Sequence, residues 1–312
     1  MKKKIALLLT AVLAATAMTA CGNSSAESAA PAEETVTEEA ATEEAAVDEA
    51  DVDEAAAADT AAMTADEERT TLTVGFDAEY PPYGFKDEET GDYTGFDLEL
   101  AQEVCNRRGW ELVKQPIDWN SKDMELNSGA VDCLWNGMTY TGRENDYTWS
   151  DPYVDNSIVI AVNADSEIQT KEDLAGKRVV AQSGSSALTA LTNNPDDGSN
   201  DENLALAATF ASLEEIADYN NAFMQMDAGL YDAIAVDIGV AQFQLSSNEG
   251  KYRILDEPIS KEEYAIAFTK GNTELRDQVQ ETLNEMAADG TIDKIVANYA
   301  DYNLPEMLII GK

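Results

Sequence analysis

The chain is 312 residues long, which is enough for one or two domains. Its formal net charge of −41 argues against a nucleic-acid partner, because binding to phosphates depends on Lys and Arg. The sequence contains no His, so it lacks the usual general base and the commonest metal ligand, and we expect no metal site and no cofactor. Its three cysteines lack the paired spacing of a disulfide framework, although a bridge between Cys105 and Cys133 stays open.

The N-terminus has the pattern of a secretory signal. A basic stretch at residues 2–4 precedes a short apolar run over residues 5–17 and then small residues, which predicts a signal peptide over residues 1–20. Cys21 follows directly, as in a bacterial lipobox. We therefore expect a lipid on Cys21 that anchors the mature protein outside the cytoplasm, on the cell membrane of a bacterium. An ordinary signal peptide followed by a chance Cys is the alternative. Residues 21–70 are acidic and rich in Ala, with almost no aromatic side chains, which predicts a disordered tether.

The predicted elements after the tether alternate between strand and helix. Residues 72–76 have the apolar alternation of a strand and lead to Asp77. A helix is predicted from Gly95 to Arg108, stopped by Gly109, with a second strand over residues 110–115 and a short helix over residues 121–127. This alternation favours an α/β fold with mainly parallel sheets and helices on both faces.

A Gly-x-x-Asp pattern occurs twice, each time at the start of a short strand. Gly129 and Asp132 accompany a strand predicted over residues 131–135, and Gly229 and Asp232 accompany one that ends at Asp237. The two aspartates Asp132 and Asp232 precede the strand ends, so we expect them to fix turns. The first strand leads to a polar tip with Asn136, Gly137, Thr139 and Arg143. Ligands in α/β folds lie outside the carboxyl ends of strands. One tip offers a cation and the other an anion, so a free amino acid could fit between them.

The second half of the chain contains two apolar runs, at residues 157–162 and 264–268, each long enough to cross between lobes. Between them, a strand over residues 178–182 is followed by a small-residue turn at Gly184, Ser185 and Ser186. This turn could bind an anion through backbone N–H groups, or Ser185 could simply cap a helix. We further predict a surface loop at 193–203, a helix at 213–226, and helices at 273–288 and 291–299.

Five segments carry a resemblance to a known family. They are residues 95–101 (GFDLELA), 137–141 (GMTYT), 149–153 (WSDPY), 173–179 (DLAGKRV) and 286–290 (MAADG). Each is weak alone, but in this order and spacing they resemble the amino-acid-binding solute-binding proteins of bacterial ABC transporters, family 3, in lipoprotein form. The resemblance implies a two-lobed periplasmic-binding-protein-like fold joined by two hinge strands. Lobe 1 would comprise residues 71–161 plus 266–312, and lobe 2 residues 162–265.

The resemblance also implies a set of ligand contacts. The loop positions that touch the ligand side chain match Asp77 and Tyr80, with Tyr83 nearby. The α-ammonium would meet the Gly137 carbonyl, the Thr139 hydroxyl and the Asp237 carboxylate, and the α-carboxylate would meet Arg143. The second-lobe turn matches Gly184, Ser185 and Ser186, preceded by Gln182, and Asn136 is a further candidate for a polar contact.

One departure from the family pattern bears on Arg143. The family usually has Thr-x-x-Arg, whereas this chain has Thr141-Gly142-Arg143, one residue shorter. We expect Gly142 to ease the tighter turn. The alternatives stay open here: Arg143 could pair with Glu144 or Asp146 on the surface, and Asp237 could be only a helix cap. Tyr80 and Tyr83 could be loop packing, and Trp135 is expected in the core.

The resemblance implies a non-enzymatic receptor that captures an amino acid and delivers it to the permease of an ABC importer. We expect a monomer, and the polar side chains suggest a polar ligand such as Gln or cystine. A dehydratase-like enzyme on the same fold is the alternative, with Asp77, Glu79 and Asp237 as candidate acids or bases. A sensory module of the same lobes is a third hypothesis.

Overall fold

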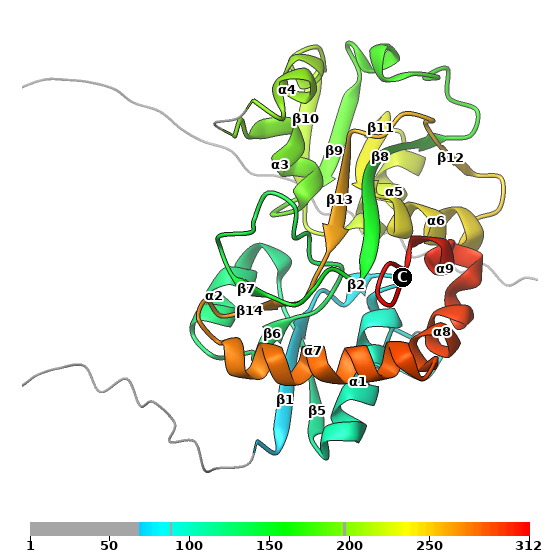
Figure 1. Cartoon of the computed structure of the whole chain (residues 1–312). Coiled ribbons are helices and arrows are strands. Elements are labelled where there is room, and N and C mark those ends of the chain that lie inside the picture. The colour runs from blue at the N-terminus through cyan, green and yellow to red at the C-terminus, as the bar shows by residue number, and fades with distance from the viewer. Residues whose placement is uncertain (1–68, 88, 196–197) are drawn as a thin grey trace, which may run out of the picture. The chain divides into compact units, whose positions relative to one another are not determined.

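The computed structural model describes residues 69–87, 89–195 and 198–312, and these form two α/β lobes (Figure 1). The predicted signal peptide, Cys21 and nearly all of the predicted tether lie outside the described residues. Within the described ranges, no helix is both long enough and apolar enough to span a membrane.

The first lobe is built on a mixed sheet with the strand order β5-β1-β6-β14-β7. β1 pairs in parallel with β5 and β6, whereas β14 is antiparallel to β6 and β7. The strands are β1 (Thr71–Phe76), β5 (Glu111–Pro116), β6 (Cys133–Leu134), β7 (Thr148–Trp149) and β14 (Ala267–Phe268). A small sheet beside it contains β2 (Glu79–Tyr80), β3 (Gly84–Lys86) and β4 (Tyr93–Thr94). The helical segments of this part of the chain are α1 (Phe96–Arg108), η1 (Trp119–Ser121), α2 (Lys122–Asn127), α7 (Thr273–Ala288), α8 (Thr291–Val296), η3 (Ala297–Tyr302) and α9 (Leu304–Met307).

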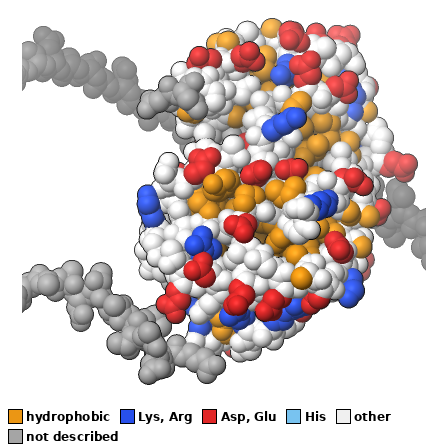
Figure 2. All heavy atoms as spheres, in the orientation of Figure 1, with side chains coloured by type: hydrophobic (Ala, Val, Ile, Leu, Met, Phe, Trp, Pro, Cys, Tyr) orange, Lys and Arg blue, Asp and Glu red, His pale blue; other side chains and the backbone are white. Residues whose placement is uncertain are grey.

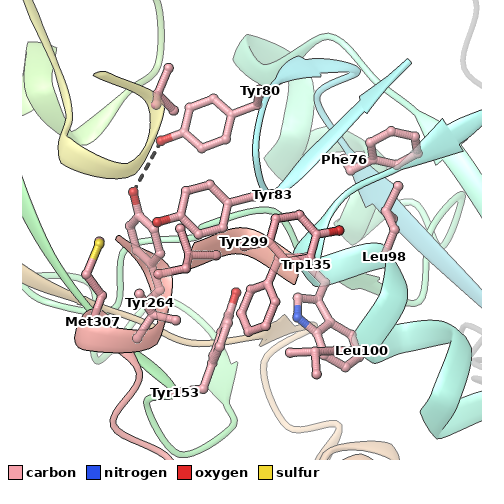
Figure 3. Packing of buried hydrophobic residues seen from close by; sticks show 14 of the residues in the cluster. Phe76, Tyr80, Tyr83, Leu98, Leu100, Trp135, Tyr153, Tyr264, Tyr299 and Met307 are labelled. Carbon is pink, nitrogen blue, oxygen red and sulfur yellow. Dashed lines mark hydrogen bonds between the residues drawn. The ribbon is translucent and has the colours of Figure 1, made fainter. Parts of the chain in front are cut away.

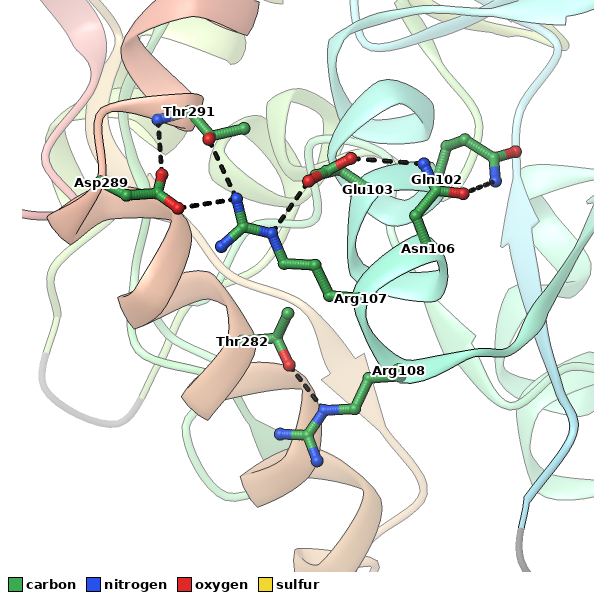
Figure 4. Close-up of polar contacts among 8 residues, drawn as sticks. All are labelled: Gln102, Glu103, Asn106, Arg107, Arg108, Thr282, Asp289 and Thr291. Atoms are coloured by element: carbon green, nitrogen blue, oxygen red, sulfur yellow. Dashed lines mark hydrogen bonds and ion pairs between the residues drawn. The ribbon is translucent and has the colours of Figure 1, made fainter.

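Helix α1 shows how the sequence builds this lobe. Its buried Leu100, Ala101 and Val104 recur at helical spacing and pack in one cluster with Leu72 and Val74 of β1. The two arginines that end α1 then join it to the C-terminal helices (Figure 4). The guanidinium of Arg107 lies 2.9 Å from the Asp289 carboxylate and donates to the Thr291 hydroxyl, while Arg108 donates to the Thr282 hydroxyl. These contacts fasten segments that are far apart in the sequence.

The second lobe is built on a sheet with the order β10-β9-β11-β8-β12, and β13 also pairs with β8. β9 is parallel to β10 and β11, and β8 is antiparallel to its neighbours. The strands are β8 (Val154–Asn163), β9 (Arg178–Gln182), β10 (Ser212–Ile216), β11 (Ala233–Asp237), β12 (Tyr252–Ile254) and β13 (Ser260–Tyr264). The helical segments are η2 (Lys171–Leu174), α3 (Ser186–Thr192), α4 (Asp201–Ala207), α5 (Tyr219–Asp227) and α6 (Ile238–Ser247).

Helices cover both faces of this second sheet, as predicted. On β9, Val179 and Ala181 belong to a cluster with Ala187 and Leu191 of α3, whereas Val180 between them packs into the cluster that contains α5 and α6 residues. Because successive strand residues point to opposite faces, a fully apolar strand is what two covered faces require.

The repeated Gly-x-x-Asp pattern has a structural meaning in both lobes. Asp132 accepts a hydrogen bond from the Thr73 N–H at 2.7 Å, and the Asp132 N–H donates to the Thr73 carbonyl. Asp232 makes the same two contacts with Arg178 and also binds its guanidinium. Each aspartate therefore ties the start of its strand to the neighbouring parallel strand, which is more specific than the turn-fixing role that the sequence suggests.

Two paired strands connect the lobes. β8 and β13 run antiparallel, with Val154 opposite Tyr264 and Ile158 opposite Ser260. The prediction of a single crossing strand over residues 264–268 was wrong in its bounds. β13 ends at Tyr264, and the chain then enters the first sheet as β14.

Three other expectations need correction. The helix predicted over residues 213–226 is divided: β10 extends the sheet next to β9, and Asp218 then caps the shorter helix α5 by accepting from the Asn221 N–H. The loop predicted at 193–203 includes the start of α4. Cys105 and Cys133 are both buried free thiols, so the disulfide left open does not form.

Candidate ligand-binding site

Both lobes contribute residues to one small cavity. Eight of the eleven predicted site residues line it: Tyr80, Gly137, Thr139, Arg143, Gln182, Ser185, Ser186 and Asp237. The other three, Asp77, Tyr83 and Asn136, are buried but do not line it. The predicted site residues thus lie close together in the structure, and three of them are buried next to the residues that line the cavity.

The Arg143 guanidinium has no carboxylate within 4 Å among the described residues. Glu144, a partner in the alternative surface role of Arg143, instead accepts a hydrogen bond from the Gly142 N–H at 2.9 Å. Gly142 has φ 79°, and the Arg143 N–H donates to the Tyr140 carbonyl, which makes a β-turn whose third residue must be left-handed. Glycine therefore permits the shortened spacing, and the Trp149 indole holds the Arg143 carbonyl at 3.0 Å.

Asp237 ends β11 and is 2% exposed. It stands at the N-cap position of α6, but its side chain caps no N–H of that helix. One carboxylate oxygen instead accepts from the Asn156 amide at 2.7 Å and from the Tyr264 hydroxyl at 2.5 Å. Burial raises the pKa of Asp237, and these neutral donors lower it only in part. The simple cap role is therefore not the one that its side chain plays.

A second buried acid supports the tip after β6. The Asp97 carboxylate accepts from the Gly137 N–H at 2.6 Å and from the Tyr153 hydroxyl at 2.8 Å. Gly137 bends at φ 58°, so its N–H points back to Asp97. Burial raises the pKa of Asp97 to about 7. Asp97 lies in the GFDLELA segment, and its role is to hold the tip that bears Thr139 and Arg143.

Asp77 joins the two lobes behind the cavity. Its carboxylate accepts from the Gln182 amide at 2.5 Å and from the Glu79 N–H at 2.8 Å, and its own N–H donates to Asn136. Burial raises the pKa of Asp77 to about 6, against the lowering effect of these hydrogen bonds. The Oε1 of Gln182 and the Nδ2 of Asn136 have no hydrogen-bond partner in the described part of the chain.

Tyr80, which lines the cavity, packs in a buried cluster with Tyr83 and Tyr264 (Figure 3). The hydroxyls of Tyr80 and Tyr264 lie 3.3 Å apart, and the rings of Tyr83 and Tyr264 meet edge to face with centroids 5.2 Å apart. Tyr83 is fully buried against the N-terminal turn of α6, so packing is its observed role. Trp135 is fully buried in the same cluster, as expected for a core residue.

The turn after β9 uses its serines locally. The Ser185 hydroxyl accepts from the Leu188 N–H at 3.1 Å and so caps α3, which is the plainer of the two interpretations left open. The Gly184 carbonyl accepts from the buried Lys122 ammonium at 3.1 Å. Burial lowers the pKa of Lys122 to about 8, and the nearby Arg143 charge adds to this effect.

Sequence reasoning missed Trp119, Lys122, Asn156 and Glu262. Trp119 lines the cavity, and Lys122 crosses between the lobes beside it. Glu262 is 8% exposed on β13 and accepts from the Thr139 hydroxyl at 2.9 Å. The strand period of two would have placed Glu262 on the same face as Tyr264, which is the one signal that the sequence offered. Asn156 and Lys122 sit in segments where a polar residue is normally exposed.

The site thus combines a guanidinium that has no carboxylate partner among the described residues with a buried carboxylate and with hydroxyl and amide groups. Within the described ranges, no group of three or more Cys, Asp or Glu side chains is placed to hold a metal ion. Such an arrangement suits a small molecule with separate positive and negative charges.

Comparison with known proteins agrees with this geometry. Residues 72–302 match the bacterial extracellular solute-binding proteins, family 3. The L-cystine-binding protein TcyJ of Escherichia coli is 28% identical over 241 residues, which is 76% of this chain and 85% of that protein.

Two solved structures are similar along most of their length. A substrate-binding protein of an ABC uptake transporter from Streptococcus pneumoniae, with bound histidine, has a TM-score of 0.67 and 28% identity, covering 73% of this chain and 92% of that one. An ancestral amino-acid-binding protein, described as a precursor of cyclohexadienyl dehydratase, has a TM-score of 0.64 and 29% identity, covering 73% of this chain and 95% of that one. The match over residues 72–302, together with the two-lobed fold, shows that this chain belongs to family 3 of the bacterial extracellular solute-binding proteins.

Proposed function

We propose that this protein is an extracytoplasmic receptor that captures a free amino acid between its two lobes and delivers it to the permease of an ABC importer. The observation that carries the proposal is the pairing of opposite charges across one cavity. Among the residues that the structure describes, the guanidinium of Arg143 has no carboxylate within 4 Å, and the buried carboxylate of Asp237 has no cationic partner.

An amino acid supplies the missing partner of each group. A planar guanidinium binds a carboxylate through two parallel hydrogen bonds, and buried charges are stable only when they are paired. Micromolar affinity requires about 8 kcal/mol, which two desolvated charge pairs and an aromatic contact can supply. The paired strands β8 and β13 would act as the hinge on which the lobes open and close.

The cavity favours a polar ligand side chain. The Oε1 of Gln182, which lines the cavity, is a buried acceptor without a partner among the described residues, and Asp77 lies directly behind Gln182. A ligand with a hydrogen-bonding side chain would satisfy such groups, whereas an aliphatic one would leave them unpaired. Relatives named for binding cystine and histidine fit this class.

We further propose a monomer held at the outer face of the bacterial cell membrane by a lipid on Cys21, with the acidic segment over residues 21–70 as its tether. The basic start, the apolar run and the Cys after small residues support this part of the proposal.

The test is a thermal-shift panel of purified protein against the common L-amino acids and cystine. A ligand that binds only the folded state raises the unfolding midpoint by mass action. We expect a shift of several degrees with one or two polar L-amino acids, and loss of that shift in Arg143→Ala and Asp237→Asn.

Two exposed charges on α8 provide matched controls. Lys294→Ala and Asp293→Asn remove one charge each at a distance from the cavity, and both should respond to the ligand as the wild type does. If folded protein shows no shift with any member of the panel, the amino-acid assignment is wrong.

A second candidate function rests on the carboxyl groups. The raised pKa values of Asp77 and Asp237 would suit a general acid, and one similar structure is a precursor of a dehydratase. Turnover of a hydroxylated ring substrate with loss of water, abolished in Asp237→Asn, would favour this enzyme. Stoichiometric binding of an unchanged amino acid would favour the receptor.

A further inference from the structure

Glu262 stands directly behind the part of the cavity where the ligand's positive charge would lie. One of its oxygens accepts from the Thr139 hydroxyl at 2.9 Å and lies 3.4 Å from the Asn156 amide, and the other accepts from the Ser260 hydroxyl at 3.0 Å. Thr139 lines the cavity, so Glu262 binds a hydroxyl group of the cavity lining directly.

The Asn156 amide joins Glu262 to Asp237. Its Nδ2 donates to Asp237 at 2.7 Å and faces Glu262 at 3.4 Å, so one neutral amide serves two buried carboxylates. Neither carboxylate has a Lys or Arg nitrogen within 4 Å among the residues that the structure describes. Two buried acids without a cation between them form an incomplete electrostatic site.

We propose that Glu262 is a positioning residue of the ammonium site, because it takes the hydrogen of the Thr139 hydroxyl and so turns the lone pairs of that oxygen toward the ligand's cation. A hydroxyl has one hydrogen and two lone pairs. When its hydrogen is committed to a carboxylate, the group can act only as an acceptor toward the cavity. This inference rests on the proposed receptor function and identifies a residue of that same site.

The two buried acids, Glu262 and Asp237, also couple ligand binding to the release of protons. Burial raises the pKa of Glu262, and the charge of Asp237 raises it further, while burial raises that of Asp237. The other titratable groups facing them are the phenols of Tyr80, Tyr83, Tyr219 and Tyr264, whose pKa values are themselves raised, so these phenols stay neutral. A bound ammonium favours the charged carboxylates and lowers their pKa values.

The sign of the pH effect follows from this linkage. Below the raised pKa values, the free site holds a proton that the ligand must displace, so affinity falls as pH falls through them. Above them, affinity is independent of pH as far as these groups are concerned. Proton release on binding in acid solution is therefore a signature of the carboxylate pair.

The experiment is calorimetric titration of the full-length protein and of Glu262→Gln with the L-amino acid that gives the largest thermal shift. Titrations at several pH values, in buffers of different ionisation enthalpy, yield the affinity and the number of protons released. Glutamine keeps the shape of the side chain but can present N–H where the carboxylate accepted, so we expect affinity to fall by about tenfold or more. The proton release of the wild type should be smaller in the variant.

Two further variants separate positioning from folding. Glu263→Gln makes the same change at the next residue of β13, which is only half-buried, and should leave affinity and proton release unchanged. In a Thr139→Val background, Glu262→Gln should weaken binding by much less than it does alone, because the hydroxyl that it positions is gone.

The outcomes distinguish the two proposals. If the wild type binds no amino acid, the receptor function fails and the role of Glu262 fails with it. If the wild type binds but Glu262→Gln matches it in affinity and proton release, only the inference about Glu262 is overturned. Equal losses for Glu262→Gln in the presence and absence of the Thr139 hydroxyl would also overturn it.

Discussion

Asp97 is a fully buried acid that holds the cavity through the backbone rather than through the ligand. It accepts from the Gly137 N–H and the Tyr153 hydroxyl, and its other oxygen has no partner among the described residues. No Lys or Arg nitrogen lies within 4 Å of this carboxylate in the described part of the chain. Such surroundings disfavour the charged form of the carboxyl group, and burial raises its pKa to about 7.

This environment predicts a pH-dependent stability. The pKa of Asp97 rises from its ordinary 3.8 to about 7 in the folded protein, so its contribution to stability is complete below about pH 4 and is lost as pH rises through 7. Asp97→Asn is always neutral and keeps an acceptor for both donors. We expect the variant to unfold roughly 5 °C above the wild type at pH 8, and near the wild type at pH 4.

Thermal unfolding across pH 4 to 9 measures this difference. Asp293→Asn, an exposed acid on α8, is the control and should track the wild type at every pH. A constant offset between Asp97→Asn and the wild type at all pH values would mean that Asp97 is charged in the folded protein.

Some residues of this site could be predicted from the sequence and others could not, for physical reasons. Arg143 and Asp237 are charges at strand ends, where α/β folds place ligands, so chain order alone suggested them. Glu262 was missed because an acid in a strand is usually exposed, and only the antiparallel pairing with β8 buries it. Likewise, Lys122 is buried because the Gly184 loop of the other lobe covers it, and no local pattern reveals that contact.

At the scale of elements, helix α6 packs closely against the first lobe at one glycine. A Cβ added at Gly239, in the first turn of α6, would lie 2.3 Å from the Tyr83 hydroxyl oxygen and 2.9 Å from two ring carbons. Tyr83 is fully buried, so it cannot move aside without leaving the cluster around Tyr264. The approach of α6 to the β2–β3 loop therefore requires glycine at this position.

We expect Gly239→Ala to lower the free energy of unfolding by about 1–3 kcal/mol, the usual cost of an overpacked core. Adding Tyr83→Phe removes the nearest atom and should restore part of that loss, measured by chemical denaturation. Ser246 is exposed on the same helix, so the control variant Ser246→Ala should leave stability nearly unchanged. If Gly239→Ala is as stable as the wild type, the two elements are not packed as described.

Elements with strong local sequence signals have the bounds that the sequence predicted. Elements whose form depends on long-range strand pairing differ from the prediction. Helix α1 has a periodic apolar face and a Gly stop, and its observed bounds agree with the prediction. The segment at β10 contains Glu214 and Glu215, which favour a helix locally, but it forms an edge strand because β9 offers a free parallel edge. The break between β13 and β14 depends on the presence of two separate sheets, which the apolar run does not encode.

For the whole molecule, hydrogen bonds between side chains and backbone of the two lobes hold the lobes together. The Gln182 amide donates to Asp77 at 2.5 Å, and the Lys122 ammonium donates to the Gly184 carbonyl at 3.1 Å. Acidic side chains are spread over both lobes on the face shown in Figure 2 rather than gathered at one place. We expect the charges that line the cavity to act more strongly on a ligand than the surface charges do, because electrostatic interactions are stronger in less polar surroundings.

The central claim is that Arg143 and Asp237 bind the two charged ends of one amino acid. Calorimetric titration tests it most directly, using the preferred L-amino acid beside its N-acetyl and carboxamide derivatives, each of which lacks one charge. We expect the parent to bind with one-to-one stoichiometry, and each derivative to bind at least a hundredfold more weakly, about 2.7 kcal/mol. Equal affinity for the parent and either derivative would contradict the claim, because the group meant to bind that charge would then contribute nothing.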